Sequence, residues 1–133
     1  MTRDVSSRYL SPWTSRALFL LMAVLAVTGM AQMPIFKRYY VADIPGLGWL
    51  AAFYTTHKLH YAAAALFLAL VFWLGTEYLL SRRRQWRPTG FGWARMVLLA
   101  LVIVTGLLRT VKNLPDHGFG PLTVLAIDWA HLF

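Results

Sequence analysis

The sequence predicts an all-α integral membrane protein, a four-helix bundle whose fourth helix is short or truncated in this chain. The first observation is composition, because 59% hydrophobic and 14% charged residues in 133 is too apolar a balance for one soluble core. The second is that four apolar stretches follow one another, three of them long enough to cross about 30 Å of hydrocarbon as helices. The expected membrane segments, all within one domain covering residues 1–133, are residues 17–36, 46–77, 91–111 and 121–133.

The first two segments differ in charge. Residues 17–36 carry no charged side chain and have the length of one helical crossing. The second segment, residues 46–77, holds Lys58 as its only charge before Glu77, so a crossing fits with room to spare. This second helix contains two of the four histidines.

The last two segments differ in length. Residues 91–111 form a full crossing, with Arg95 near enough to its start to snorkel toward headgroups. Residues 121–133 open on Pro121, a favourable first-turn residue, and amount to roughly 20 Å of helix. Either the chain ends half-way through the membrane or this helix continues in a longer chain. We expect the second, because a helix end in hydrocarbon leaves four carbonyls without partners.

Basic residues predict the orientation, because cytoplasmic loops are enriched in lysine and arginine. The arginines before the first helix and after the second are Arg3, Arg8, Arg16, Arg82, Arg83, Arg84, Arg87 and Arg95. We therefore expect a multi-pass protein of the bacterial cytoplasmic (inner) membrane with a cytoplasmic amino terminus and cytoplasmic residues 81–95. The net charge of +8 then reflects topology and attraction to anionic lipid, and predicts no nucleic-acid partner.

The connections expected on the outer side are residues 34–56 and 112–120. Residues 34–56 mix aromatic, basic and apolar side chains, so we expect this connection to lie along the membrane surface. It can offer a docking face to a partner subunit or act as a simple interfacial anchor. The chain has no cysteine, which excludes disulfides, covalent c-type haem, cysteine-ligated iron–sulfur clusters and a thiolate nucleophile.

A weak internal repeat relates the two helix pairs. The first and third helices both end in Val-Thr-Gly, at residues 27–29 and 104–106, and each is followed by an outer connection and a helix containing a histidine. These histidines are His60 and His131, and because their helices run in the same direction we expect them at similar depth. Two neutral imidazoles from different helices are the arrangement that ligates a b-type haem. Gly29 and Gly106 would let a flat macrocycle approach the backbone, or would serve plain helix packing.

Other polar residues have more than one interpretation. His57, one turn before His60, is an alternative ligand, a hydrogen-bond partner of a propionate or quinone, or an interfacial residue. His117 is expected to be solvated or interfacial. Asp128 can hydrogen-bond the ring N–H of a ligand, move a proton at a quinone pocket, or pair with a basic residue on a neighbouring helix.

The outer ends of the helices carry cations, and haem propionates would emerge there. Arg109 and Lys112 are the candidates near the end of the third helix. Each histidine also has a simpler interpretation, as a hydrogen-bonded packing residue within the membrane.

Several short motifs resemble a known family. Residues 91–96 (Phe-Gly-Trp-Ala-Arg-Met), 104–106 (Val-Thr-Gly) and 129–131 (Trp-Ala-His) look like the third and fourth helices of the membrane cytochrome b subunits of formate dehydrogenases and nickel–iron hydrogenases. His60, with the apolar run behind it, looks like their second helix. The resemblance implies an electron-transfer subunit, with no catalytic residues of its own, that passes electrons between a partner subunit of a respiratory complex and the quinone pool.

The resemblance also implies a cofactor. His60 and His131 match the pair that ligates the haem b nearer the periplasm. The family's other haem uses a histidine at the start of the first helix, where this chain reads Pro12-Trp-Thr-Ser-Arg16. One haem b is therefore implied, and the second is left open.

Two other function classes stand beside this one. The protein can be a haem-free anchor or assembly subunit whose histidines pack or contribute to a quinone site. A small transporter or proton channel using Asp128 and His131 as a relay ranks last, because the chain lacks the interrupted, inverted repeats typical of many transporters.

The orientation can be tested with a single introduced cysteine, because the chain has none of its own. A cysteine at Gln85 should react with a membrane-impermeant maleimide only from the cytoplasmic side. Labelling only from the periplasmic side would show that the orientation is inverted.

Overall fold

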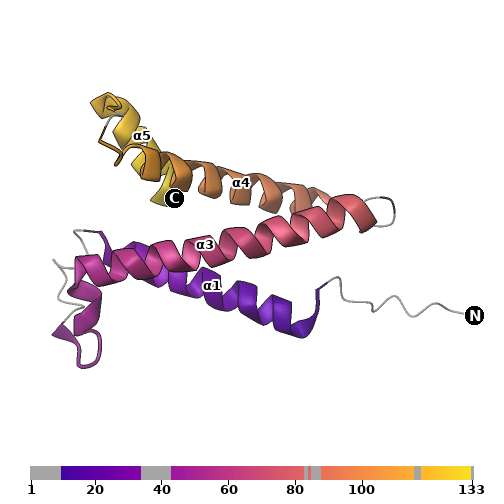
Figure 1. The fold of residues 1–133 in the computed structure, drawn as a ribbon, viewed down its shortest axis with the longest axis horizontal. Coiled ribbons are helices and arrows are strands. Elements are labelled where there is room, and N and C mark those ends of the chain that lie inside the picture. The colour runs from indigo at the N-terminus through magenta and orange to yellow at the C-terminus, as the bar shows by residue number, and fades with distance from the viewer. Residues whose placement is uncertain (1–9, 34–42, 83, 85–87, 116–117, 133) are drawn as a thin grey trace, which may run out of the picture. The chain divides into compact units, whose positions relative to one another are not determined.

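The computed structural model of the protein describes residues 10–33, 43–82, 84, 88–115 and 118–132 (Figure 1). Within these residues the chain is helical and contains no strand, which confirms the all-α prediction. The helices are α1 (Pro12–Ala31), α3 (Phe53–Glu77), α4 (Gly90–Val111) and α5 (Pro121–Leu132), with a 3₁₀ turn η2 (Gly48–Ala51) and a π-helical turn η3 (Tyr78–Arg82).

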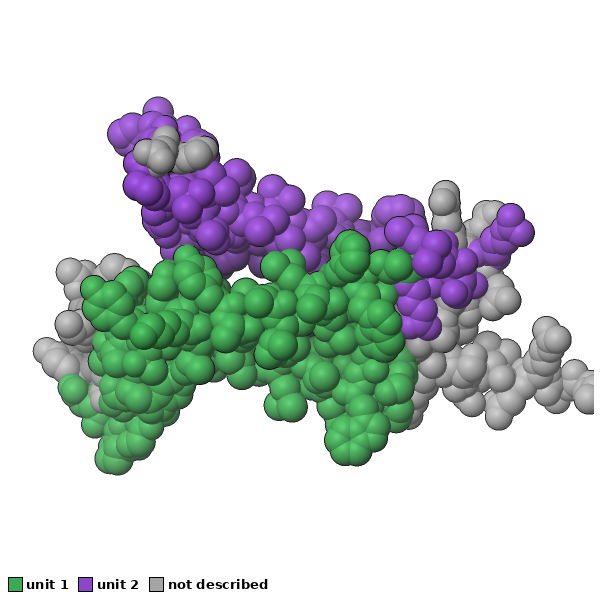
Figure 2. Space-filling view, viewed as in Figure 1, with its two compact units in different colours: residues 1–76 green, residues 77–133 purple. Residues whose placement is uncertain are grey.

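The chain forms two compact units, distinguished by colour in Figure 2. Unit 1, Met1–Thr76, contains α1, η2 and nearly all of α3. Unit 2, Glu77–Phe133, contains η3, α4 and α5. Each unit therefore pairs one long apolar helix with a following helix that carries a histidine.

The first helix starts earlier than the apolar run from residue 17. Ser11 caps it, with its hydroxyl accepting a hydrogen bond from the backbone N–H of Thr14 at 3.3 Å. Pro12 follows in the first turn, where its missing N–H leaves no hydrogen bond unmade. The helix ends at Ala31, and the remainder of the expected segment from residue 34 lies outside the described residues.

The second long helix starts later than expected. Gly46 has a φ of 87°, a left-handed conformation that favours glycine, and η2 follows it. Ala52 (φ −77°, ψ 89°) separates η2 from α3, which begins at Phe53 rather than near residue 46. Apolar composition alone does not distinguish this turn from the helix that follows.

The boundaries of α4 and α5 agree closely with the expected segments. Thr89 caps α4, its hydroxyl accepting from the N–H of Gly92 at 3.2 Å. α5 begins at Pro121 as expected, and its 12 residues amount to about 18 Å of helix. Phe133 lies outside the described residues.

Among the residues that the structure describes, three helical stretches are long and apolar enough to cross a membrane, namely Pro12–Ala31, Phe53–Ser81 and Gly90–Val111. Large apolar side chains on them are exposed, including Phe19 (73%), Phe72 (78%) and Phe91 (83%). In water such surfaces would be unfavourable, whereas lipid solvates them. The protein is therefore a multi-pass membrane protein in contact with lipid.

Candidate functional site

In unit 1 a buried hydroxyl on α1 holds a histidine on α3. Oγ1 of Thr28, a residue only 1% exposed, lies 2.9 Å from Nδ1 of His60. The same oxygen lies 2.6 Å from the carbonyl oxygen of Val24, a separation that requires the hydroxyl proton between the two oxygens. The hydroxyl therefore donates to Val24 and accepts from Nδ1–H of His60. A neutral imidazole protonated at Nδ1 has its lone pair on Nε2.

The neighbouring glycine makes room for this ring. A Cβ atom on Gly29 would lie 3.4 Å from Cε1 and 3.8 Å from Nδ1 of His60. The imidazole thus lies directly against the backbone of α1. The close approach expected at Gly29 is made by the histidine ring itself.

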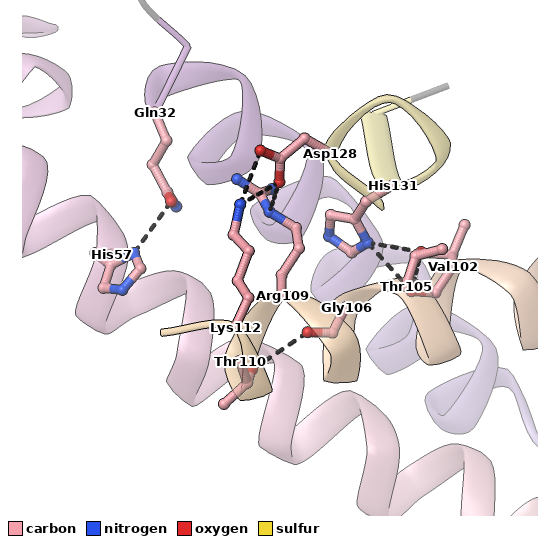
Figure 3. A network of polar contacts seen from close by, with 10 residues as sticks. All are labelled: Gln32, His57, Val102, Thr105, Gly106, Arg109, Thr110, Lys112, Asp128 and His131. Carbon is pink, nitrogen blue, oxygen red and sulfur yellow. Dashed lines mark hydrogen bonds and ion pairs between the residues drawn. The ribbon is translucent and has the colours of Figure 1, made fainter. Parts of the chain in front are cut away.

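A second polar contact joins the same two helices one turn away. The amide nitrogen of Gln32 donates to the carbonyl oxygen of Thr28 at 3.1 Å, which leaves the amide oxygen as an acceptor. That oxygen lies 3.1 Å from Nδ1 of His57, which therefore donates (Figure 3). The His57 ring also stacks on Phe53 at 5.3 Å and contacts Tyr61 at 4.4 Å, measured between ring centres.

Unit 2 contains the same histidine arrangement. Oγ1 of Thr105, a buried residue on α4, lies 3.1 Å from Nδ1 of His131 on α5 (Figure 3). The same oxygen donates to the carbonyl oxygen of Leu101 at 2.8 Å. The carbonyl oxygen of Val102 lies 3.2 Å from the same Nδ1. Because a carbonyl can only accept, Nδ1 carries the proton here too, and the lone pair of the neutral ring is on Nε2.

The glycine of unit 2, Gly106, lies closer to its histidine ring than Gly29 does in unit 1. A Cβ atom on Gly106 would lie 2.9 Å from Cε1 of His131, closer than real Cβ atoms come to another heavy atom. The ring of His131 therefore occupies space that only glycine leaves open.

The second contact in unit 2 is ionic. Nζ of Lys112 lies 2.6 and 2.8 Å from the two carboxylate oxygens of Asp128, and Nε of Arg109 lies 3.0 Å from one of them (Figure 3). The three side chains are between 15% and 34% exposed. Of the roles that the sequence leaves open for Asp128, the structure shows pairing with basic residues. Two cations and one carboxylate leave this cluster with one excess positive charge.

The two units therefore share one pattern of side chains. In each, a threonine near the end of the first helix holds a histidine of the second, the next residue is a glycine under the imidazole, and a polar contact follows one turn away. The matching residues are Thr28, His60, Gly29, Gln32 and His57 in unit 1, and Thr105, His131, Gly106, Arg109 and Asp128 in unit 2. The internal repeat seen in the sequence is thus a repeat of contacts.

Sequence reasoning misses two parts of this pattern. It does not identify Gln32, although this residue lies one turn after Thr28 as Arg109 does after Thr105. It finds the threonines only as part of a shared tripeptide, not as partners of the histidines. His117 lies outside the described residues.

A comparison of the chain with protein-family models, with curated proteins and with solved structures finds no significant match. The resemblance to b-type cytochromes of respiratory complexes therefore stays a prediction. The chemistry of the site is defined by its own residues, which are two imidazoles whose Nδ1 atoms each lie against a threonine hydroxyl.

The two glycines can be compared by matched alanine substitutions. Gly106→Ala should displace the ring of His131, because the new methyl group overlaps Cε1, at an overpacking cost of about 1 to 3 kcal/mol. Gly29→Ala meets His60 at 3.4 Å and should be accommodated. The measurement is the ring nitrogen chemical shifts of ¹⁵N-labelled histidine. Equal displacement in the two variants, or none in Gly106→Ala, would contradict the packing described.

The ionic cluster can be tested through Asp128→Asn. This change leaves Arg109 and Lys112 together without a counter-charge, and should lower the free energy of unfolding by about 1 to 2 kcal/mol, between the values of surface and buried pairs. Thermal unfolding in detergent measures it. Lys112→Met combined with Asp128→Asn should recover part of the loss, because one cation is removed with the anion. Unchanged stability in Asp128→Asn would show that the cluster contributes nothing.

Proposed function

We propose that the protein is a membrane-embedded b-type cytochrome subunit that carries electrons between a partner redox subunit and the quinone pool. The observation that supports this most directly is the repetition of one histidine arrangement in both units. In each, an imidazole lies against a glycine with its Nδ1 facing an acceptor on the preceding helix, an arrangement that favours the Nδ1–H tautomer with the lone pair on Nε2. Ligation by two neutral imidazoles is a common way to hold a b-type haem in a helical membrane protein.

In this proposal His60 and His131 are the two axial ligands. The donor set fits the group, because both rings are in the tautomer that coordinates through Nε2. When bound, haem b supplies a one-electron iron couple, and the protein supplies ligands, orientation and surrounding charge. One haem is proposed. The start of α1, Pro12-Trp-Thr-Ser-Arg16, holds no histidine for a second.

His57 is the competing ligand. Its Nδ1–H is also directed to an acceptor, so its lone pair is likewise on Nε2. His60 is favoured because the residue at its place in unit 2 is a histidine, whereas the residue at the place of His57 is Asp128, which is ion-paired. His57 then fixes the two helices of unit 1 through Gln32.

Charge in unit 2 also supports the proposal. Arg109 and Lys112 together exceed the charge of Asp128 by one, and a haem brings two propionate groups. Excess positive charge attracts ionised carboxylates and stabilises their charged form. Arg109 and Lys112 are therefore proposed to attract the propionates while holding Asp128.

The protein lies in the bacterial cytoplasmic membrane with its amino terminus in the cytoplasm, as the arginine distribution predicts. It works as a subunit of a respiratory oxidoreductase, and its outer connection, residues 34–56, is the proposed docking face. The first part of that connection, residues 34–42, lies outside the described residues.

A haem-free anchor or assembly subunit is the second candidate. The observation that favours it is that Thr28 and Thr105 already give both histidines a hydrogen-bond partner, which is enough for helix packing. A reduced-minus-oxidised visible spectrum of protein purified with a haem supply separates the two. Absence of haem bands from well-folded protein would reject the cytochrome and favour the anchor.

Alanine variants test the ligand assignment. His60→Ala and His131→Ala should each lose most of the bound haem or leave the iron five-coordinate, because one axial ligand is removed. His57→Ala should change the spectrum only modestly, and His117→Ala should have little effect. Haem content and the low-spin spectrum of bis-histidine iron are the measurements. Loss of haem in His57→Ala with retention in His60→Ala would move the ligand one turn, and retention in His131→Ala would remove it from the site.

A further inference from the structure

We propose that Thr28 and Thr105 are positioning residues that hold the ligand histidines as Nδ1–H tautomers. The inference rests on the proposed function, and it assigns a role to two hydroxyl groups that act on iron only through the imidazoles. Both threonines are buried, at 1% and 7% exposure, so water does not compete for their oxygens.

The hydroxyl proton has a fixed place in each unit. In Thr28 it is directed to the Val24 carbonyl at 2.6 Å, and in Thr105 to the Leu101 carbonyl at 2.8 Å. Each threonine oxygen therefore presents only a lone pair toward its histidine. A ring protonated at Nε2 would turn its own Nδ1 lone pair toward that oxygen, at 2.9 Å in unit 1 and 3.1 Å in unit 2, which is repulsive.

The carbonyl of Val102 strengthens this arrangement in unit 2. It lies 3.2 Å from Nδ1 of His131 and has no proton to give. The His131 proton is thus shared between two acceptors. The tautomer of His131 is consequently fixed by the backbone as well as by Thr105.

The acidic side chain of unit 2, Asp128, is ion-paired with two basic residues. Asp128 lies one turn from His131, but its carboxylate is held by Lys112 and Arg109 at 2.6 to 3.0 Å. The side chain that the structure shows facing Nδ1 of His131 is a neutral hydroxyl, as it is for His60. A neutral acceptor orients the ring and raises its basicity without drawing the proton away.

The test compares valine with serine at each threonine. Valine keeps the shape and removes the acceptor, whereas serine keeps the hydroxyl. Loss of an outer partner of a metal ligand lowers metal affinity by about 10- to 100-fold, so Thr28→Val should bind haem that much more weakly than Thr28→Ser in a haem titration. The loss of haem affinity in Thr105→Val should lie at the lower end of that range, because the carbonyl of Val102 still accepts from His131. Circular dichroism of each pair checks that the helices are retained.

A second measurement needs no haem. In the full chain purified without haem, ¹⁵N shifts of the histidine rings report which nitrogen carries the proton. His60 and His131 should be Nδ1–H in the wild type and in both serine variants, and Thr28→Val should weaken that preference at His60. Nε2–H rings in the wild type, or valine variants that bind haem as tightly as their serine counterparts, would overturn the positioning role.

The two measurements separate the two proposals. Nδ1–H rings in a wild-type protein that binds no haem would reject the cytochrome function, and would leave the threonines as helix-packing partners only. Haem binding by a wild-type protein whose rings are Nε2–H would keep the function and reject the role of the threonines.

Discussion

The hydrogen bond between a buried threonine and a histidine is the contact on which each half of this protein depends. Lipid removes the hydrophobic drive that joins helices in water, so packing of small residues and polar contacts must hold them. A neutral imidazole in such surroundings also needs an acceptor for its N–H. Thr28 and Thr105 provide it, and Gly29 and Gly106 let the rings reach it. One short sequence, Val-Thr-Gly, thus sets the distance between two helices and the orientation of the histidine between them.

One contact fixes a point between two helices, and a second contact one turn away fixes their register. The two units solve this second task with different chemistry. Unit 1 uses the side-chain amide of Gln32 with His57, and unit 2 uses Asp128 with two cations. The ion pairs of unit 2 can be partly exposed, because contact with water lowers the desolvation cost of the charged side chains. The second contact thus places an ion cluster in unit 2 where unit 1 has an amide and an imidazole, so the two units share a pattern of contacts but differ in its chemistry.

The sequence predicted the fold class and the three full-length crossings, because an uncharged apolar run of about 20 residues is long enough to span a bilayer and too apolar for a soluble surface helix. It placed the start of α5 correctly, since Pro121 is a specific signal. It placed the starts of α1 and α3 less well, because hydropathy does not register a cap at Ser11 or a left-handed Gly46. The internal repeat placed His60 and His131 at equivalent positions, but the sequence did not predict that Thr28 and Thr105 contact them. Contacts such as Gln32 with His57 depend on helix rotation, which an almost uniformly apolar sequence does not reveal.

The choice between a cytochrome and a simple anchor depends on what packing alone would require. A histidine that only joins two helices is satisfied by either tautomer, provided some partner faces the ring. Here Nδ1 of each ring faces a hydroxyl whose own proton is directed to a backbone carbonyl, an arrangement that favours the Nδ1–H tautomer in both units. Ligation of iron through Nε2 needs this repeated tautomer, whereas packing does not. The tight glycine at position 106 adds to the argument, because it fixes where the ring lies as well as which atom is protonated. For these reasons we favour the haem-binding function over a purely structural role for the two histidines.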